Sequence, residues 1–298
     1  MSKHESNIQL NDGHQMPVLG IGTLDRQNRD KIPNAVAAAI KYGYRQIDTA
    51  TSYQTEPHVA EGISRSGLKR SELFITSKLW LTQYGFDKAI KGFELSLKHL
   101  KTDYLDLYLL HWPAPSDFEA TVEAFRALIQ LKSEGRLRSI GVANFCQKHL
   151  QDLIDRNGVM PSVNQIELHP FFIQKPMRDF HSKLGIVTQA WSPIGNSVRL
   201  FSKEEKKRDP LTHSNIIALS QKHKKTPAQI ILRWHIQHGL SAIPKSIQEE
   251  RIKANIGIFD FSLDSQDMAQ IDAMDTGKRS GPDPEQVNAN TYQFKIAE

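Results

Sequence analysis

The chain has 298 residues, of which 38 are Lys or Arg and 33 are Asp or Glu, giving a formal net charge of +5. This length suits one large α/β domain or two ordinary ones, and no Pro/Gly/Ser-rich linker or low-complexity tract divides it, so we expect a single domain over residues 1–298. Apart from the run KEEKKR near residue 205, basic residues are interleaved with acids, which favours scattered surface charge over a nucleic-acid-binding patch. No apolar run approaches the roughly 20 residues that span a bilayer, so no membrane segment is predicted.

Two features bear on the cellular compartment. The N-terminal segment MSKHESNIQLNDGHQMP lacks the apolar core of a secretory signal. The single cysteine, Cys146, cannot form an intramolecular disulfide, which fits a reducing compartment. We therefore expect a cytoplasmic protein.

Strand-like and helix-like segments alternate along the chain. A hairpin over residues 1–16, turning at Asn11-Asp12-Gly13, opens the sequence. Eight short segments that are apolar on both faces, as strands of a buried parallel sheet are, follow at 17–23, 44–49, 73–79, 103–110, 138–145, 162–168, 185–191 and 240–244. Amphipathic helix patterns lie at 88–100, at 120–136 with Gly135 as C-cap, and at 225–239, which Thr226-Pro227 opens and Gly239 closes.

Eight alternations within one domain favour a closed (β/α)8 TIM barrel over an open sheet, because a strand with its return helix needs about 30 residues. Two features exceed a minimal barrel: the N-terminal hairpin, which is placed to plug the barrel floor, and an extra helix at 264–275. Two long connections, at 194–214 and in the C-terminal tail over 277–298, are candidates for covering a ligand, with disorder as the alternative.

Several common site motifs are incomplete here or have a better structural explanation. Gly20-Ile21-Gly22 begins a Rossmann fingerprint, but Asp25 stands where the third glycine is required, and no P-loop occurs. His235 and His238 lie one helical turn apart, and a solvent-facing helix explains them better than a metal site. Cys146 is interpreted as a buried structural thiol, because no dedicated base is evident. No metal site is predicted.

Polar and aromatic side chains stand at the ends of successive predicted strands. They are Asp48, Lys78, His111, Asn144, Gln165, Trp191 and Lys245. In a (β/α)8 barrel the carboxyl ends of the strands converge on one mouth, where the chemistry of that fold takes place. The pattern therefore predicts an active site at that mouth.

Four residues near strands two to four form a coherent acid-catalytic set. Asp48 is placed to pair with Lys78 when that lysine is buried. A lysine ammonium beside Tyr53 favours the phenolate, so we expect the pKa of Tyr53 to fall below its ordinary value of about 10. His111 would orient a substrate carbonyl. Singly, each has a structural alternative, such as a helix cap, a surface ion pair or a core histidine, but together they describe acid-catalysed addition to C=O.

The chain resembles the aldo-keto reductases. The resemblance lies in GYRQIDTATSY, ITSKLW, DLYLLHWP, GVANF, NQIELHP, QAWSPIG and IPKSIQEERIKAN, in family order over about residues 6–285. WSPIG and the ending GKRSGPDP are most similar to the bacterial 2,5-diketo-D-gluconate reductase group. The resemblance implies a (β/α)8 barrel oxidoreductase that binds NADPH in extended form without a Rossmann fold. Members are often monomers, so we expect a monomer.

The resemblance also implies individual roles. Tyr53 matches the general acid, assisted by Lys78 and Asp48, and His111 matches the residue that orients the carbonyl. The positions that match cofactor contacts are Gly22, Thr23, Asp48, Asn144, Gln165, Trp191, Ser192, Ile194, Lys245, Ser246, Arg251 and Asn255. In that set Asn144 and Gln165 match contacts to the nicotinamide carboxamide, and Trp191 matches the aromatic ring on which the nicotinamide stacks. Ser192 and Ile194 match the segment that approaches the pyrophosphate. The clamp on the 2′-phosphate is matched by Lys245, Ser246 and Arg251, and a contact to adenine is matched by Asn255.

Two positions depart from the family pattern. Many relatives have serine where this chain has Ala143, and glutamate where it has Ala254. Each change removes a cofactor hydrogen bond of about 1 kcal/mol. Because Lys245, Ser246 and Arg251 are retained, NADPH is still expected to be preferred over NADH.

We therefore expect NADPH-dependent reduction of small polar carbonyls such as keto-sugar acids, dicarbonyls or simple aldehydes. The short loop after strand four indicates an open pocket, with Leu24, Trp80, His111 and Trp112 as the expected substrate contacts. Two alternatives stay open: a regulatory or redox-sensing subunit that binds a nicotinamide cofactor with little turnover, and a barrel lyase or hydrolase without cofactor. The second leaves the predicted phosphate clamp unexplained.

Overall fold

The computed structural model describes residues 7–195 and 209–291. Most of the predicted mouth loop at 194–214, the first six residues of the predicted hairpin segment and the tail beyond residue 291 lie outside these ranges.

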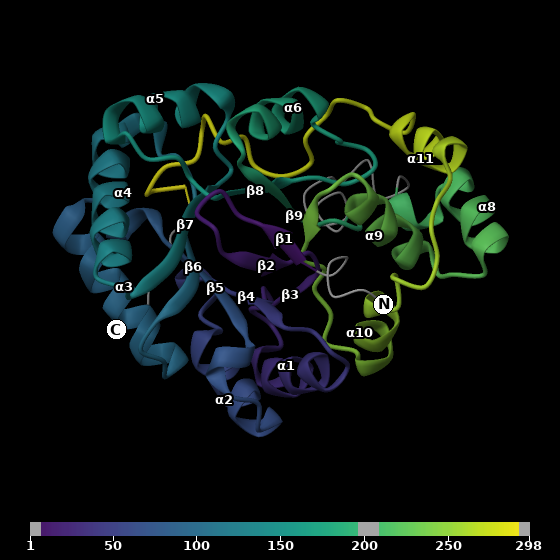
Figure 1. Cartoon of the computed structure of the whole chain (residues 1–298), viewed down its shortest axis with the longest axis horizontal. Coiled ribbons are helices and arrows are strands. Elements are labelled where there is room, and N and C mark those ends of the chain that lie inside the picture. Colours follow the sequence, from purple (N-terminus) through teal and green to yellow (C-terminus); the bar gives the residue numbers. More distant parts are fainter. Residues whose placement is uncertain (1–6, 196–208, 292–298) are drawn as a thin grey trace.

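The described residues form an eight-stranded, all-parallel sheet that curls into a nearly closed barrel (Figure 1). Its strands are β3 (Gly20–Gly22), β4 (Gln46–Asp48), β5 (Phe74–Leu79), β6 (Leu105–Leu110), β7 (Leu137–Ala143), β8 (Val163–Glu167), β9 (Val187–Trp191) and β10 (Ser241–Ala242), each paired with the next in the chain. Parallel bridges from Leu19 to Ala242 and from Gly22 to Lys245 join the first strand region to the last. The predicted (β/α)8 class is therefore confirmed.

Helices form an outer ring around the strands (Figure 1). They are α1 (Ile32–Lys41), α2 (Glu56–Ser66), α3 (Phe86–Leu100), α4 (Phe118–Ser133), α5 (Gln147–Asn157), α6 (Lys175–Leu184), α8 (Ser214–His223), α9 (Pro227–Gln237), α10 (Glu249–Ile256) and α11 (Ser265–Asp272). Helix α11 is the extra helix predicted at 264–275, and it packs against α8.

Local signals account for helix ends that the sequence predicts. The hydroxyl of Thr226 accepts a hydrogen bond from the amide of Gln229, so this residue caps α9 with Pro227 in the first turn. Gly135 takes a positive φ of 76° just after the C-cap of α4, a conformation that glycine adopts at little cost.

The N-terminal hairpin closes one end of the barrel. Its strands, β1 (Asn7–Gln9) and β2 (Gln15–Pro17), pair antiparallel, and Figure 1 shows them crossing the centre of the barrel. Leu10 and Met16 are buried in one apolar cluster with side chains from the barrel strands, such as Leu107 and Val163. The hairpin therefore forms a hydrophobic floor, as predicted.

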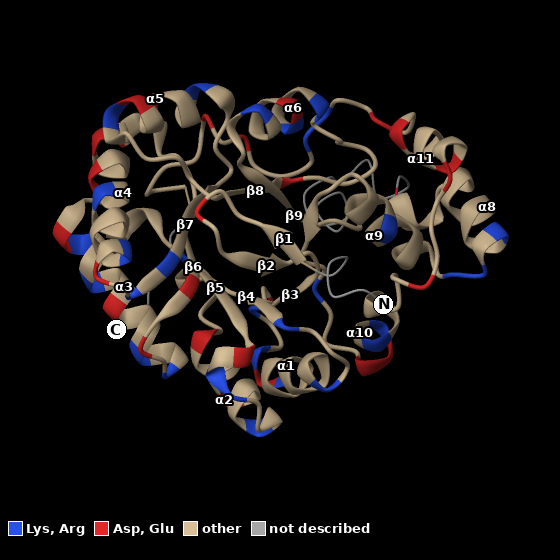
Figure 2. Ribbon diagram, in the orientation of Figure 1, with Lys and Arg blue, Asp and Glu red and all other residues tan. Residues whose placement is uncertain are grey.

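The outer helices carry acidic and basic residues side by side (Figure 2). Among the described residues, no helix has both the length and the apolar character needed to cross a membrane.

The prediction that α9 presents two histidines to solvent is wrong. His235 is 0% exposed and its Nε2 lies 3.0 Å from the carbonyl oxygen of Pro193, and burial lowers the pKa of His235 to about 3. His238 is half-buried, with Nε2 2.8 Å from Oδ1 of Asp272 in α11. The chain after β9 and helix α11 cover the face of α9 that the sequence leaves open.

Candidate active site

The barrel topology brings the predicted strand-end residues to one mouth. Asp48 ends β4, Lys78 is the second-last residue of β5, and His111 directly follows β6. Tyr53 ends a short 3-10 turn over Thr51–Tyr53, immediately beyond β4. All four lie at the carboxyl ends of neighbouring parallel strands.

Lys78 is fully buried and surrounded by acceptors. Its Nζ lies 2.5 Å from Oδ1 of Asp48 and 2.8 Å from the carbonyl oxygen of Thr49, and it donates to the Tyr53 hydroxyl at 3.4 Å. Burial alone would lower the pKa of Lys78, but the charges and hydrogen bonds of Asp48 and Tyr53 outweigh it and raise that pKa. The site therefore holds a paired ammonium next to the phenol.

The pKa of Tyr53 is raised, so the prediction of a lowered value is wrong for the protein without ligand. Burial of the phenol is the largest cause, and the charge of Lys78 opposes it without cancelling it. Tyr53 therefore carries its proton at neutral pH, which is the state that a proton donor needs.

His111 sits beside this phenol in an aromatic enclosure. Its ring meets those of Tyr53 and Trp80 edge-on, with centroids 5.6 and 5.2 Å away, and lies roughly parallel to that of Trp112 at 6.4 Å. Burial first, and the charge of Lys78 second, lower the pKa of His111 well below its usual range. The imidazole is therefore neutral and can donate a single N–H to a polar group.

Of the four predicted substrate contacts, three lie in this enclosure: Trp80, His111 and Trp112. Trp80 and Trp112 are buried against His111. Leu24, in the loop after β3, is 45% exposed. Nδ1 of His111 lies 3.4 Å from Oγ of Ser52, a partner that the sequence analysis missed although this serine directly precedes Tyr53.

The residues that match the family's contacts to the nicotinamide carboxamide already form hydrogen bonds within the protein. The amide of Gln165 donates to Oδ2 of Asp48 at 2.8 Å and to Gln189 at 2.7 Å. Asn144 donates to the carbonyl oxygen of His111 at 3.0 Å and accepts from the indole of Trp191 at 2.8 Å. A bound carboxamide would have to share or exchange these hydrogen bonds.

Trp191 is half-buried at the end of β9 and contacts the C-terminal tail. A Cβ on Gly281 would lie 2.6 Å from Cη2 of Trp191, so only glycine fits between them without a shift. The amides of Ser280 and Gly281 donate to the carboxylate of Glu167 at 3.0 and 3.1 Å, which fixes the tail over this edge of the mouth. Local sequence patterns do not reveal these tail contacts, because Glu167 lies 114 residues away from Gly281.

The residues that match the phosphate clamp follow β10, the strand next to β9. Lys245 and Ser246 are half-exposed just before α10, and Arg251 is exposed within it. Lys245 forms an ion pair with Asp25, a residue that the sequence analysis did not assign to the site. Asn255 is buried in α10. The two cations, Lys245 and Arg251, and the aromatic ring of Trp191 fit a nicotinamide cofactor that carries phosphate groups.

Four further positions belong to the expected cofactor set. The amide of Gly22 donates to the carbonyl oxygen of Pro244 at 3.1 Å, and the hydroxyl of Thr23 donates to the carbonyl oxygen of Asp48 at 2.9 Å. Ser192 takes a positive φ of 51°, and Ile194 packs against the core.

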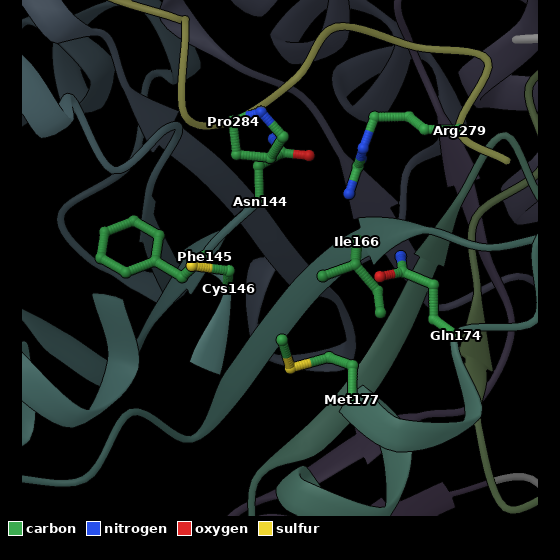
Figure 3. Close-up of a pocket in the computed structure, with 8 residues that line it drawn as sticks. All are labelled: Asn144, Phe145, Cys146, Ile166, Gln174, Met177, Arg279 and Pro284. Atoms are coloured by element: carbon green, nitrogen blue, oxygen red, sulfur yellow. The ribbon is translucent and has the colours of Figure 1, made fainter. Parts of the chain in front are cut away.

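Cys146 is not the buried structural thiol that the sequence predicts. It is half-exposed, and its Sγ lies 3.2 Å from Nδ1 of His149. It borders a small pocket beneath the tail, lined by Asn144, Phe145, Cys146, Ile166, Gln174, Met177, Arg279 and Pro284 (Figure 3). Figure 3 shows the Arg279 side chain pointing into this pocket from the tail.

Comparisons with known proteins agree with this geometry. A model of the Aldo/keto reductase family matches residues 18–276. The chain is 46% identical over 287 residues to morphine 6-dehydrogenase of Pseudomonas putida, covering 96% of each chain. It is 42% identical to glyoxal reductase of Bacillus subtilis (strain 168), covering 95% of this chain and 98% of that one. Among solved structures, a variant of Gox0644 in complex with NADPH aligns with a TM-score of 0.86 at 40% identity, covering 95% of this chain and 98% of that one. The protein therefore belongs to the aldo/keto reductase family.

Proposed function

We propose that this oxidoreductase uses NADPH to reduce small polar aldehydes and ketones to alcohols, with Tyr53 as the proton donor. The observation that carries the proposal is the buried contact of 3.4 Å between the hydroxyl of Tyr53 and the ammonium of Lys78, directly beside His111. A phenol held protonated beside a fixed cation is suited to giving up its proton only when an alkoxide develops.

NADPH as cofactor is supported by the charge at the mouth and by the NADPH named for the Gox0644 variant. Lys245, Ser246 and Arg251 would hold the 2′-phosphate, with Asn255 near the adenine. Trp191, Asn144 and Gln165 would position the nicotinamide, and Gly22, Thr23, Ser192 and Ile194 would line its path. When bound, NADPH supplies the hydride.

The chain's own residues would then orient and protonate the carbonyl oxygen of the substrate. Neutral His111 donates a hydrogen bond that orients it, and Tyr53 transfers its proton as negative charge develops there. Lys78 stabilises the phenolate that remains, and Asp48 keeps Lys78 charged and in place. Because these four side chains are held in place before reaction, little reorganisation opposes the charge transfer.

The enclosure favours compact substrates. Trp80 and Trp112 are buried against His111, while Leu24, in the loop after β3, is exposed. The name of the B. subtilis relative, glyoxal reductase, supports dicarbonyls as the first class, with keto-sugar acids of the 2,5-diketo-D-gluconate type as the second. We further propose that the chain acts as one cytoplasmic, monomeric unit on free small molecules.

The test compares wild-type protein with Tyr53→Phe and follows NADPH consumption with glyoxal, methylglyoxal, a keto-sugar acid and a simple aldehyde. The variant should lose at least 100-fold in kcat, since it lacks the only proposed acid, while its NADPH affinity stays within about two-fold. Tyr84→Phe controls for loss of a phenol near the pocket, because the buried Tyr84 hydroxyl donates a hydrogen bond to the backbone carbonyl oxygen of Trp112 at 2.7 Å.

Undiminished turnover in Tyr53→Phe would contradict the mechanism. Tight NADPH binding without turnover on any carbonyl would favour a regulatory or redox-sensing subunit. Failure to bind NADPH at all would favour a lyase or hydrolase.

A further inference from the structure

We propose that Cys146, His149 and Glu285 form a binding site for a borderline-soft divalent cation such as Zn²⁺, which ties the C-terminal tail to the first turn of α5. The site lies outside the proposed catalytic residues, and its argument does not depend on the proposed function.

The three side chains form one cluster around the His149 ring. Sγ of Cys146 lies 3.2 Å from Nδ1 of His149 and 3.2 Å from Oε1 of Glu285, and Nε2 of His149 lies 3.1 Å from the same carboxylate oxygen. One ligand atom from each residue falls within 4.8 Å of the others. Ligand atoms around tetrahedral Zn²⁺ are about 3.4 to 3.6 Å apart. Nδ1 of His149 also accepts a hydrogen bond from the amide of Cys146 at 3.3 Å, so Nε2 is the ring nitrogen open to an ion. Oε1 of Glu285 then needs a shift of only a few tenths of an ångström, while the Cys146 side chain must rotate to bring Sγ closer to Nε2.

Two of these ligands come from one turn of helix. Cys146 is the N-cap of α5 and His149 is its third residue, so both lie on one face of the first turn. The His149 ring is buried beside Phe118 and Phe145, with centroids 5.9 and 6.0 Å away. Two ligands on one ordered helix turn reduce the conformational entropy that metal binding would otherwise cost.

The third ligand is free to adjust. The side chain of Glu285 is 51% exposed and belongs to the tail, between the buried residues Pro284 and Val287. It can therefore rotate to complete three protein ligands, leaving a fourth position for water, an arrangement common in zinc sites that are not purely structural.

Charge and ligand chemistry select the type of ion. Thiolate, imidazole and carboxylate together suit Zn²⁺ better than Mg²⁺ or Ca²⁺, which prefer oxygen ligands. The negative charges of the thiolate and the carboxylate together balance the charge of a divalent cation. They also reduce its repulsion by the nearby positive charges of Lys148 and Arg279. Burial first, with a contribution from Glu285, raises the pKa of Cys146, so the thiol stays protonated at neutral pH and the metal must displace that proton.

Binding would add a second anchor to the tail. The first anchor is Glu167, which accepts hydrogen bonds from the amides of Ser280 and Gly281. In Figure 1 the tail, drawn in yellow, runs past α6 toward α5, and the three ligands lie where it reaches α5. A cation here would therefore reduce detachment of the tail next to Trp191.

The test titrates Co²⁺, a spectroscopic substitute for Zn²⁺, into the purified full-length protein. Because Cys146 is the only cysteine, a thiolate-to-cobalt charge-transfer band in the near ultraviolet reports this residue alone. We expect such a band at one equivalent, its removal by Zn²⁺, and its loss in Cys146→Ser. Glu285→Gln, at an exposed position that should not affect folding, should weaken Co²⁺ binding at least ten-fold.

A matched control is His99→Gln, because His99 lies 3.2 Å from Glu56 in a pair without sulfur, and its change should leave the band intact. Zn²⁺ should also slow tryptic cleavage after Lys278 and Arg279 in the wild-type protein but not in Glu285→Gln. Absence of the charge-transfer band would overturn the site, and an unchanged band in Glu285→Gln would overturn the role of the tail.

Discussion

At the scale of single residues, Lys78 organises the mouth of the barrel. Its ammonium contacts a carboxylate, a backbone carbonyl and the Tyr53 hydroxyl without access to water. Such a group stabilises the fold only while Asp48 neutralises it, and it assists proton release only while it stays charged. Structural and chemical roles are therefore combined in one side chain.

The first prediction concerns pH. Because the pKa of Tyr53 is raised above its usual value, the protonated donor persists through neutrality and is lost only as pH rises through that raised pKa, above about 10. The kcat/KM for carbonyl reduction should therefore stay level from neutral pH upward and fall only in strong alkali. A fall centred below pH 8 would contradict the assignment of Tyr53 as the acid.

The second prediction concerns Asp25, whose carboxylate pairs with Lys245. In Asp25→Asn the lysine is released for a phosphate, so NADPH affinity should rise about five-fold, the equivalent of about 1 kcal/mol for a partly exposed ion pair. NADH lacks the 2′-phosphate, and its affinity should change less than two-fold. Fluorescence titration of both cofactors measures the ratio, and equal changes for both would remove Lys245 from the 2′-phosphate site.

At the scale of elements, helix α6 is joined to the sheet through a buried histidine. Nδ1 of His181 lies 2.8 Å from Oγ1 of Thr188 in β9, and Nε2 lies 2.9 Å from the amide of Asn164 in β8. Burial lowers the pKa of His181 to about 4. The neutral ring therefore serves as a polar link between α6 and two strands.

The third prediction follows from this lowered pKa. The unfolded chain takes up a proton at His181 near pH 6.5 and the folded chain only near pH 4, so stability is full above pH 6.5 and falls as pH decreases through this interval. Between pH 7 and pH 5 this residue should cost about 2 kcal/mol of unfolding free energy. Urea unfolding of wild type and His181→Gln at both pH values should show a shallower pH dependence in the variant. Equal slopes would show that His181 titrates normally in the folded protein.

At the scale of the whole molecule, the N-terminal hairpin completes the barrel core. Met16 is 0% exposed and lies in a cluster with residues from β5, β6, β8 and β9. The hairpin thus shields the bottom of the barrel from water while the opposite end remains open for chemistry.

The fourth prediction is that Met16→Ala lowers the unfolding free energy by about 2 to 5 kcal/mol, because it leaves a cavity at the barrel floor. Gln9→Ala, at an exposed position of the same hairpin, should change stability by less than about 0.5 kcal/mol. Urea unfolding measures both. A cost below 1 kcal/mol for Met16→Ala would mean that the hairpin packs loosely.

The fold and the location of the site follow from local patterns. The alternation of apolar strands with amphipathic helices predicted the barrel, and the cap at Thr226 and the floor hairpin follow from residues a few positions apart. Asp48, Lys78 and His111 stand at strand ends, and parallel strands bring such ends to one mouth whatever the detailed packing.

Predicted strand ends were less accurate than the strands themselves. The last strand was predicted over 240–244, but only Ser241–Ala242 pair regularly. Strand ends depend on how each neighbour twists away, which the sequence of one strand does not specify.

Contacts between residues that are distant in sequence decided the partners, the exposure and the protonation of individual side chains. The partner of Lys245 lies 220 residues away, Cys146 and Glu285 are 139 residues apart, and His235 is covered by the segment after β9. The direction of the pKa shift at Tyr53 also depended on tertiary structure, because burial outweighed the lysine charge that the sequence had already indicated. Periodicity and capping act over a few residues, so the sequence by itself determined elements, their order and the mouth of the barrel. Burial and ion pairing sum over every segment packed around a group, so only the tertiary structure decided protonation, partners and exposure.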